Sequence, residues 1–173
     1  MSQFENPYAP SDSPGGFQSE PVMDGTLATL SERFAAAFVD GIINFIAVVP
    51  FAFGAGIVVG AMFGDNAMAQ LVAQAIGGVI AIGLFLAIHG YFLATRSQTL
   101  GKMLLKTKIV SDSGAPLSFG ELYTKRYLVL QVLSLIPIVG GLISLVDVLF
   151  IFRPNRKCLH DDIAGTKVIK LPA

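Results

Sequence analysis

No lysine or arginine occurs between Phe34 and Thr95, a stretch that reads FAAAFVDGIINFIAVVPFAFGAGIVVGAMFGDNAMAQLVAQAIGGVIAIGLFLAIHGYFLAT. A helix needs ~20 mainly apolar residues to span a bilayer, so this stretch is long enough for two crossings. The polar run Gly64-Asp65-Asn66 interrupts it and predicts the loop between the crossings. We therefore expect two transmembrane helices, at about residues 30–63 and 69–94.

The composition of the whole chain agrees with a membrane location. Of the 173 residues, 53% are hydrophobic and 14% are charged, whereas about a quarter of a typical soluble protein is charged. Residues 1–25 are rich in proline, serine and glycine and carry acidic but no basic side chains, which predicts a disordered cytoplasmic tail. This tail lacks the basic start and apolar run of a signal peptide. A single cysteine, Cys158, excludes an intrachain disulfide.

The basic residues predict the orientation in the membrane. They fall at Arg33, between Arg96 and Arg126, and between Arg153 and Lys170, with none in the loop at residues 64–66. By the positive-inside rule, both termini and the 96–126 segment should be cytoplasmic, which requires an even number of crossings. We expect the protein in the cell (inner) membrane, with one transmembrane domain over residues 26–170.

A second apolar run, residues 127–152, leaves the number of crossings open between three and four. It could form one tilted span, or a hairpin that turns at residues 137–141, where a proline and two glycines would break a helix. An even number of crossings favours the hairpin, with helices at residues 119–136 and 142–152. Ser118 and Glu121 have the spacing of a capping box at the start of the third helix.

Two short runs outside the apolar segments have strand-like character, residues 106–110 before the turn at residues 111–114, and residues 166–171. They could pair as a small cytoplasmic ribbon. The expected fold is thus an all-α membrane protein, a small bundle of three to four transmembrane helices with a short cytoplasmic β-ribbon.

Three polar residues share one face of the first predicted helix, because Arg33, Asp40 and Asn44 are spaced by seven and four residues. A charged carboxylate deep in a membrane helix costs about 2.5 kcal/mol or more, so Asp40 needs a partner or a water-filled cavity. Two interpretations stay open at this point. Asp40 could be a buried anchor hydrogen-bonded to neighbouring helices, or it could be a cation or proton site.

Other polar residues in the apolar runs are weaker candidates. Asp147, one turn after Ser144, lies six residues before Arg153 and could be drawn to the cytoplasmic surface by local charge pairing. The ordinary pKa of a histidine, about 6.5, would suit His89 to a proton relay, although a hydrogen-bonded interfacial histidine is the commoner case. Small residues at four-residue spacing predict close helix packing, within one chain or between two, at Gly56, Gly60 and Gly64 and at Ala73 and Gly77.

Several site motifs are incomplete. The run from Thr99 to Lys102 lacks the flanking residues of a phosphate-binding loop. Potential metal ligands gather at the C-terminal end, but they lack the second half of a zinc-site spacing: Cys158, His160, Asp161 and Asp162. No nucleophile and base have an interpretable spacing. We therefore expect no enzyme activity, no cofactor, no bound metal and no nucleic-acid partner.

Taken together, these residues resemble the RDD family of membrane proteins, named for one arginine and two aspartates. The resemblance covers about residues 30–169 and rests on Arg33 to Asp40 (RFAAAFVD), Gln98 to Val110 (QTLGKMLLKTKIV), Arg126, and Leu159 to Thr166 (LHDDIAGT). The family pattern places its arginine on Arg33 and its aspartates on Asp40 and Asp161, with His160 beside the second. The resemblance implies about three spans and a transport-type role.

Two functions follow from the resemblance. In the first, monovalent cation/proton exchange, we hypothesise that Asp40 alternates between a proton and the cation, with Arg33 favouring the ionised carboxylate and burial opposing it. In the second, a non-catalytic adaptor in a membrane complex, the glycine faces and residues 159–166 would hold partner proteins. A homo-oligomer is also expected, because a monomer this small has little room for a sealed pathway.

Overall fold

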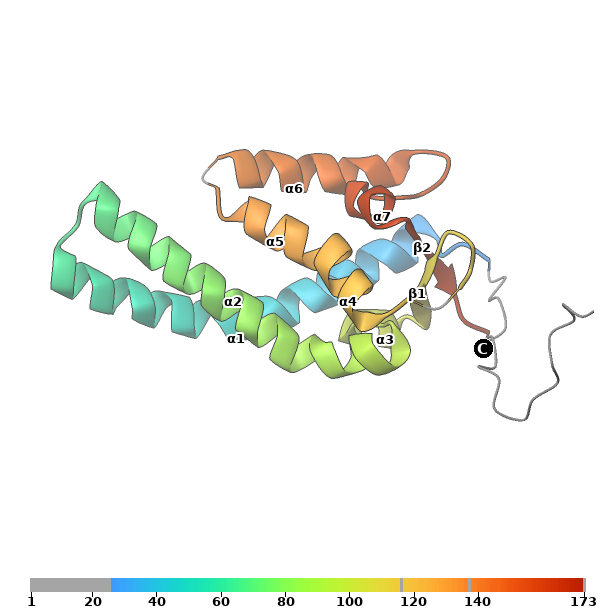
Figure 1. The fold of residues 1–173 in the computed structure, drawn as a ribbon, viewed down its shortest axis with the longest axis horizontal. Helices are drawn as coiled ribbons and strands as arrows, with labels where there is room; N and C mark the ends of the chain where they lie inside the picture. The colour runs from blue at the N-terminus through green and yellow to red at the C-terminus, as the bar shows by residue number, and fades with distance from the viewer. Residues whose placement is uncertain (1–25, 116, 137, 173) are drawn as a thin grey trace, which may run out of the picture.

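The computed structural model describes residues 26–115, 117–136 and 138–172. The predicted tail at residues 1–25, and Pro137 in the predicted turn, lie outside these ranges. The described chain is mostly helical and includes one two-stranded sheet (Figure 1).

Two long helices joined by a short loop form one arm of the molecule (Figure 1). Helix α1, Leu30–Phe63, begins with a capping box between Thr29 and Glu32 and ends at Gly64, whose positive φ of 75° favours glycine. Helix α2, Ala67–Arg96, begins where the side chain of Asn66 accepts a hydrogen bond from the amide of Ala69 (2.9 Å). The predicted helices at residues 30–63 and 69–94 and the loop between them are confirmed.

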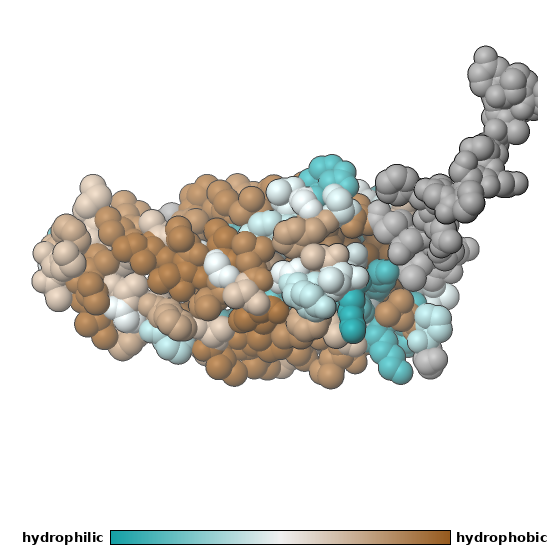
Figure 2. All heavy atoms as spheres, turned by 60° about the horizontal axis from the view of Figure 1, so that its bottom comes forward, coloured by the Kyte–Doolittle hydropathy of each residue, from teal (hydrophilic) through white to brown (hydrophobic). Residues whose placement is uncertain are grey.

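Most side chains of α1 and α2 point outward. Both helices are long and apolar enough to cross a membrane, and only 6% and 11% of their most apolar windows are buried inside the molecule. Phe53 and Val79, for example, are 71% and 70% exposed. Figure 2 shows a broad hydrophobic surface over much of the molecule, with the polar residues gathered at the end that carries the ribbon. The apolar residues of this arm therefore do not form an internal core.

A second, shorter helical hairpin lies beside the first (Figure 1). Its first leg comprises α4, Phe119–Glu121, the π-helical η1, Leu122–Leu128, and α5, Val129–Ser134. Its second leg comprises α6, Val139–Leu149, and the 3-10 turn η2, Phe150–Phe152. The predicted helix at residues 119–136 thus ends two residues early, and the one predicted at 142–152 begins three residues early.

The predicted capping box at the start of this hairpin forms only in part. The hydroxyl of Ser118 accepts a hydrogen bond from the amide of Glu121 (3.3 Å), as expected. The carboxylate of Glu121, however, accepts from the hydroxyl of Ser118 (2.9 Å) instead of from a backbone amide. The side chain that should have capped the backbone is satisfied by a nearer donor.

The predicted ribbon is confirmed. Strand β1, Thr107–Ser111, pairs antiparallel with β2, Thr166–Lys170, and Ile109 lies opposite Val168. Two short helices complete this end of the molecule: α3, Leu100–Leu104, and α7, Leu159–Ala164. The buried core lies here, where the ribbon, α2 and η1 meet: Ala28, Phe85, Leu93, Ile109, Leu122, Tyr123 and Val168.

Of the glycines expected to pack closely, Gly77 of α2 does contact α1, since a Cβ added there would lie 3.8 Å from Ala52. A Cβ added at Gly56, Gly60 or Gly64 would meet no described atom within 4 Å, so this face of α1 packs against nothing described in the chain. In contrast, a Cβ at Gly101 would lie 2.2 Å from the carbonyl oxygen of Ala36, and one at Gly78 would lie 2.2 Å from Leu135. The chain thus depends on glycine where α3 meets the backbone of α1, whereas at Gly78 the side chain of Leu135 would have to move.

Candidate functional site

The polar face predicted on α1 divides between two clusters. Arg33 contacts α7, whereas Asp40 and Asn44 contact α2 and α3. Among the described residues, no ion pair within 4.0 Å joins Arg33 to Asp40, because the guanidinium of Arg33 pairs with Asp161. The expected direct action of Arg33 on Asp40 therefore does not fit the geometry, although both residues occupy the predicted face.

The first cluster is a buried network that we call the clasp, formed by Arg33, Arg126, Asp161 and Thr166. Nη2 of Arg33 donates to Oδ2 of Asp161, and Nη1 of Arg126 donates to Oδ1 of the same carboxylate. Nη1 of Arg126 also donates to the hydroxyl of Thr166 (2.5 Å), and the amide of Cys158 donates to Asp161 (3.0 Å). The clasp thereby joins the start of α1, the π-helical η1, α7 and β2.

Because the clasp is buried, each of its charged residues depends on the presence of the others. Asp161 is 0% exposed and Arg126 is 2% exposed. Burial pushes the pKa of Asp161 upward, but the charges of Arg126 and Arg33 outweigh it, so this pKa lies well below the usual aspartate range. Loss of one partner from a buried pair typically costs about 3–5 kcal/mol, because an uncompensated charge stays behind. The geometry of Asp161 is that of a structural anchor.

The second cluster surrounds Asp40. Its Oδ1 accepts from the amide of Gly101 (2.7 Å), and its Oδ2 accepts from the hydroxyl of Thr99. Nδ1 of His89 lies 3.9 Å from Oδ1, and Nζ of Lys102 lies 4.0 Å from Oδ2. Asp40 therefore sits at the first turn of α3, with one imidazole and one ammonium group within ion-pair distance.

Asn44 connects this carboxylate to the buried histidine. Its side-chain amide donates to the backbone carbonyl of Asp40 (2.7 Å) and lies 3.2 Å from Nε2 of His89. The amide of Leu100 donates to the other ring nitrogen of His89 (3.4 Å). His89 is 0% exposed, whereas the side chain of Asp40 is 14% exposed. Three titratable groups, Asp40, His89 and Lys102, thus form one partly accessible unit.

The position of Asp40 also agrees with the rejection of a phosphate-binding loop at residues 99–102. The exposed amides at the start of a helix attract anions. Here the internal carboxylate of Asp40 binds the amide of Gly101 and the hydroxyl of Thr99. An anion of the chain itself therefore takes the position that a phosphate would need.

A third group joins Asp147 of α6 to α7. The carboxylate of Asp147 accepts from the amide of His160 (2.8 Å) and lies 2.8 Å from Nδ1 of the same residue. The expected local pairing with Arg153 does not form, because Arg153 binds Asp162 (2.5 Å) on the surface. The hydroxyl of Ser144 donates to the carbonyl of Gly140 (2.9 Å), so it is engaged within its own helix.

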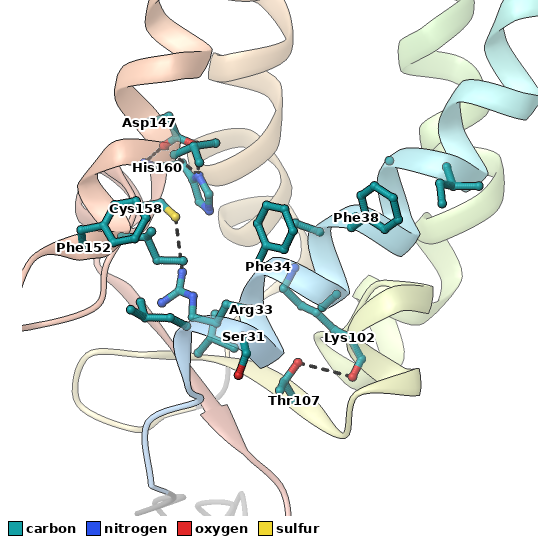
Figure 3. Close-up of a pocket in the computed structure, with 18 of the residues that line it drawn as sticks. Ser31, Arg33, Phe34, Phe38, Lys102, Thr107, Asp147, Phe152, Cys158 and His160 are labelled. Atoms are coloured by element: carbon teal, nitrogen blue, oxygen red, sulfur yellow. Dashed lines mark hydrogen bonds and ion pairs between the residues drawn. The ribbon is translucent and has the colours of Figure 1, made fainter.

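Burial shifts the pKa values of Cys158, at the N-cap of α7, and of His160 in α7. Burial raises the pKa of Cys158 to about 11, which keeps its sulfur as a thiol at neutral pH. Burial and the nearby charge of Arg126 lower the pKa of His160, so its imidazole is neutral at neutral pH. Nη2 of Arg33 lies 3.7 Å from the sulfur and donates to it (Figure 3).

A cavity of about 790 Å³ lies beside this group, between α1 and the segment from α6 to α7. Its walls are mostly apolar and include Phe34, Phe38, Phe45, Val148 and Phe152. Arg33, Asp147, Cys158 and His160 line one side of it, as Figure 3 shows. A ligand could therefore reach Asp147, Cys158 and His160 through this mostly apolar cavity.

Sequence reasoning placed the main polar residues but missed several partners. In the sequence, Arg126 stands out only as part of the family motif, although it is a central member of the clasp. The available signal is an arginine immediately before a long apolar run. Thr99 and Lys102 were considered only as part of a phosphate loop. The pairing of Asp147 with His160 had no sequence signal, because it joins residues on different helices.

Comparison with known proteins supports the resemblance noted above. The family model described as the RDD family matches residues 27–165. No curated protein and no solved structure matches the chain. The matched residues include the cluster around Asp40, all of α7 as far as its C-terminal glycine, and every member of the clasp except Thr166. Since the match covers most of the sequence, the chain belongs to the RDD family.

Proposed function

We propose that the protein is an integral membrane protein in which α1 and α2 cross the bilayer. The support is the outward-facing apolar surface of these helices, since large exposed apolar patches require a membrane or a partner. The polar residues gather at the end of the molecule that carries the ribbon, away from the loop between α1 and α2 (Figure 2). By the positive-inside rule, we place that end of the molecule and both termini of the chain on the cytoplasmic side. The membrane would be the cell membrane.

Within this arrangement, we propose a transport role in which Asp40 exchanges a proton with a monovalent cation. One observation carries the proposal: a carboxylate on an apolar helix lies within 4.0 Å of both His89 and Lys102. Ionisable residues inside membrane proteins commonly mark ion or proton pathways. A purely structural anchor would need the hydrogen bonds from Thr99 and Gly101, but it would not need two further titratable groups.

The chemistry of this exchange is competition for one carboxylate. With the cation absent, a proton can be held by Asp40 or by His89, whose ring lies 3.9 Å away. A cation that reaches the 14% exposed carboxylate stabilises its ionised form, and the proton leaves through the histidine. The donors from Thr99 and Gly101 stay in place in both states and hold the carboxylate in position.

The test uses purified protein in proteoliposomes that contain a pH-sensitive dye. An imposed Na⁺ or K⁺ gradient should drive proton flux through the wild type, and Asp40→Asn should abolish it. Asp65→Asn, which changes an exposed carboxylate in the α1–α2 loop, is the matched control and should keep wild-type flux. Proton flux in Asp40→Asn equal to that of the wild type, or no gradient-driven flux in the wild type, would reject the exchange.

The orientation can be tested with introduced cysteines. Cys158 is buried and its pKa is raised to about 11, so the slowly reacting wild type serves as the background control. Asp65 and Asn155 are exposed, one in the loop between α1 and α2 and the other before α7. A membrane-impermeant thiol reagent added to intact cells should label Asp65→Cys and spare Asn155→Cys. The opposite pattern would invert the topology.

A second candidate, a membrane adaptor, draws on the open face of α1 at Gly56 and Gly60. Small residues let a helix of another protein approach closely. Residues 159–166 offer only part of their length to a partner, because Asp161 and Thr166 are fully buried in the clasp while Asp162 and Ile163 are exposed. Gly60→Leu should therefore remove co-purifying membrane proteins while leaving Asp40-dependent proton flux intact. Unchanged co-purification would exclude this face.

A further inference from the structure

Three donor side chains of different chemistry converge beside the clasp: Asp147 of α6, Cys158 at the N-cap of α7, and His160 of α7. One oxygen, one sulfur and one nitrogen atom of these residues all lie within 4.8 Å of one another. Asp147 and Cys158 are buried and His160 is half-buried. We propose that this group binds a borderline-soft divalent metal ion, of which Zn²⁺ is the best-fitting example.

The donor set matches the preference of this class of metal. Zn²⁺ is bound by cysteine sulfur, histidine nitrogen and carboxylate oxygen, and sites with three protein ligands keep a fourth position open. A carboxylate and a thiolate together offset the two positive charges of the ion. The three residues also line the cavity of about 790 Å³ between α1 and α6, which provides an entry path and space for a fourth ligand.

The surrounding contacts already hold the ligands in suitable positions. The amide of His160 donates to Oδ1 of Asp147 (2.8 Å), whereas Oδ2 contacts Nδ1 of His160, the nitrogen with which it would share the metal ion. Nδ1 of His160 lies 2.8 Å from Oδ2, and its Nε2 lies 3.8 Å from Oδ1 of Asp161. A metal-bound histidine usually directs its other ring nitrogen to a carboxylate or carbonyl. Asp161 therefore occupies the position of that outer carboxylate (Figure 3 shows the three ligands).

Binding requires the removal of one proton. The thiol of Cys158 loses its hydrogen as a proton when the metal–sulfur bond forms. The hydrogen on Nδ1 of His160 moves to Nε2, on the side of Asp161, and Nδ1 then binds the metal. The sequence alone does not reveal this site, because Cys158 and His160 supply only two donors. The third donor, Asp147, lies on α6, a separate helix earlier in the chain.

The first experiment titrates the purified full-length protein in detergent with Co²⁺, which substitutes for Zn²⁺ and reports sulfur ligation by a charge-transfer absorption band. We expect one equivalent of Co²⁺, displaced by one equivalent of Zn²⁺. Cys158→Ser should remove the band, and His160→Asn should weaken Zn²⁺ binding by at least ~100-fold, since even outer contacts of metal sites are worth ~10–100-fold. Asp162→Asn changes a neighbouring carboxylate that pairs with Arg153, and it should bind as the wild type does.

A second measurement keeps all three ligands of the metal site intact, so a misfolded ligand variant cannot mislead it. A thiol-reactive dye labels Cys158 slowly, and bound Zn²⁺ should slow it further, with full reversal by a chelator. Asp40→Asn should keep this protection, so the metal site can be judged separately from the proposed transport role. Absence of the Co²⁺ band in folded wild type, or equal Zn²⁺ affinity in Cys158→Ser, His160→Asn and the wild type, would overturn the proposal.

Discussion

Asp161→Asn should open the clasp, because this carboxylate is the shared partner of two buried guanidinium groups. The substitution keeps the size of the side chain and removes its charge, so Arg33 and Arg126 both lose their ion pair. Removing one partner of a buried pair costs about 3–5 kcal/mol. At about 1.4 kcal/mol per factor of ten, the equilibrium for undocking α7 should rise by about 100-fold to 4,000-fold.

The native cysteine reports this opening directly. Cys158 lies at the N-cap of α7, is 7% exposed, and donates its backbone amide to Asp161. Labelling by a thiol-reactive dye then requires α7 to leave its site, so the labelling rate follows the opening equilibrium when reclosing is fast. The charge of Asp161 also raises the pKa of the thiol, so its loss makes the sulfur more reactive by itself. Rates measured at several pH values separate this chemical gain from the structural one.

The control is Asp162→Asn on the same helix. Asp162 pairs with Arg153 at the surface, with both side chains more than a third exposed, and such pairs contribute at most about 1 kcal/mol. Its labelling rate should therefore stay within about fivefold of the wild type. If Asp161→Asn labels no faster than Asp162→Asn once the pKa of the thiol is taken into account, the clasp does not hold α7 in place.

Three other perturbations follow from the same contacts. Gly101→Ala should lower stability by about 1–3 kcal/mol, because its Cβ would meet a backbone carbonyl at 2.2 Å; thermal unfolding followed by circular dichroism should show this, with Gly83→Ala, where space is open, as a control that should lose no stability. Burial lowers the pKa of His160 in the folded protein, so the unfolded chain binds the extra proton first and stability should fall as pH drops below about 6.5; a melting series that shows the same pH dependence in His160→Gln would contradict this. Arg126→Lys has a shorter side chain that does not place its ammonium group where Nη1 of Arg126 donates to both Asp161 and Thr166, and a loss of about 1.5–3 kcal/mol is expected in the same melting assay; an unchanged melting temperature would mean that the charge alone suffices.

Helices and strands could be predicted from the sequence because their signals are local. The apolar run from Phe34 to Thr95 and its polar interruption at residues 64–66 contain the information for α1 and α2. The same holds for the β-ribbon, whose two runs needed only a turn signal and a strand-like composition. The turn of the second hairpin was predicted at residues 137–141, but α6 already begins at Val139, so Gly140 and Gly141 lie inside this helix and do not interrupt it.

The clusters were predicted as residues but not as contacts. Arg33 and Asp40 do share one face of α1, as their spacing requires, but they are seven residues apart along the axis and meet different neighbours. The partner of Arg33 is Asp161, which is 128 positions away in the sequence. No local pattern distinguishes this pairing from a direct one with Asp40, because both place an arginine near a carboxylate.

The sequence by itself determined the apolar helices, their order and the ribbon. It also identified the polar residues that need a partner because they lie in an apolar environment. Only the tertiary structure decided which partners these residues have: Asp161 for Arg33 and Arg126, the first turn of α3 for Asp40, and His160 for Asp147. The physical reason is range. Hydrophobic periodicity and turn chemistry act over a few residues, whereas a buried charge is satisfied by whichever opposite charge or donor the packed helices bring within about 4 Å.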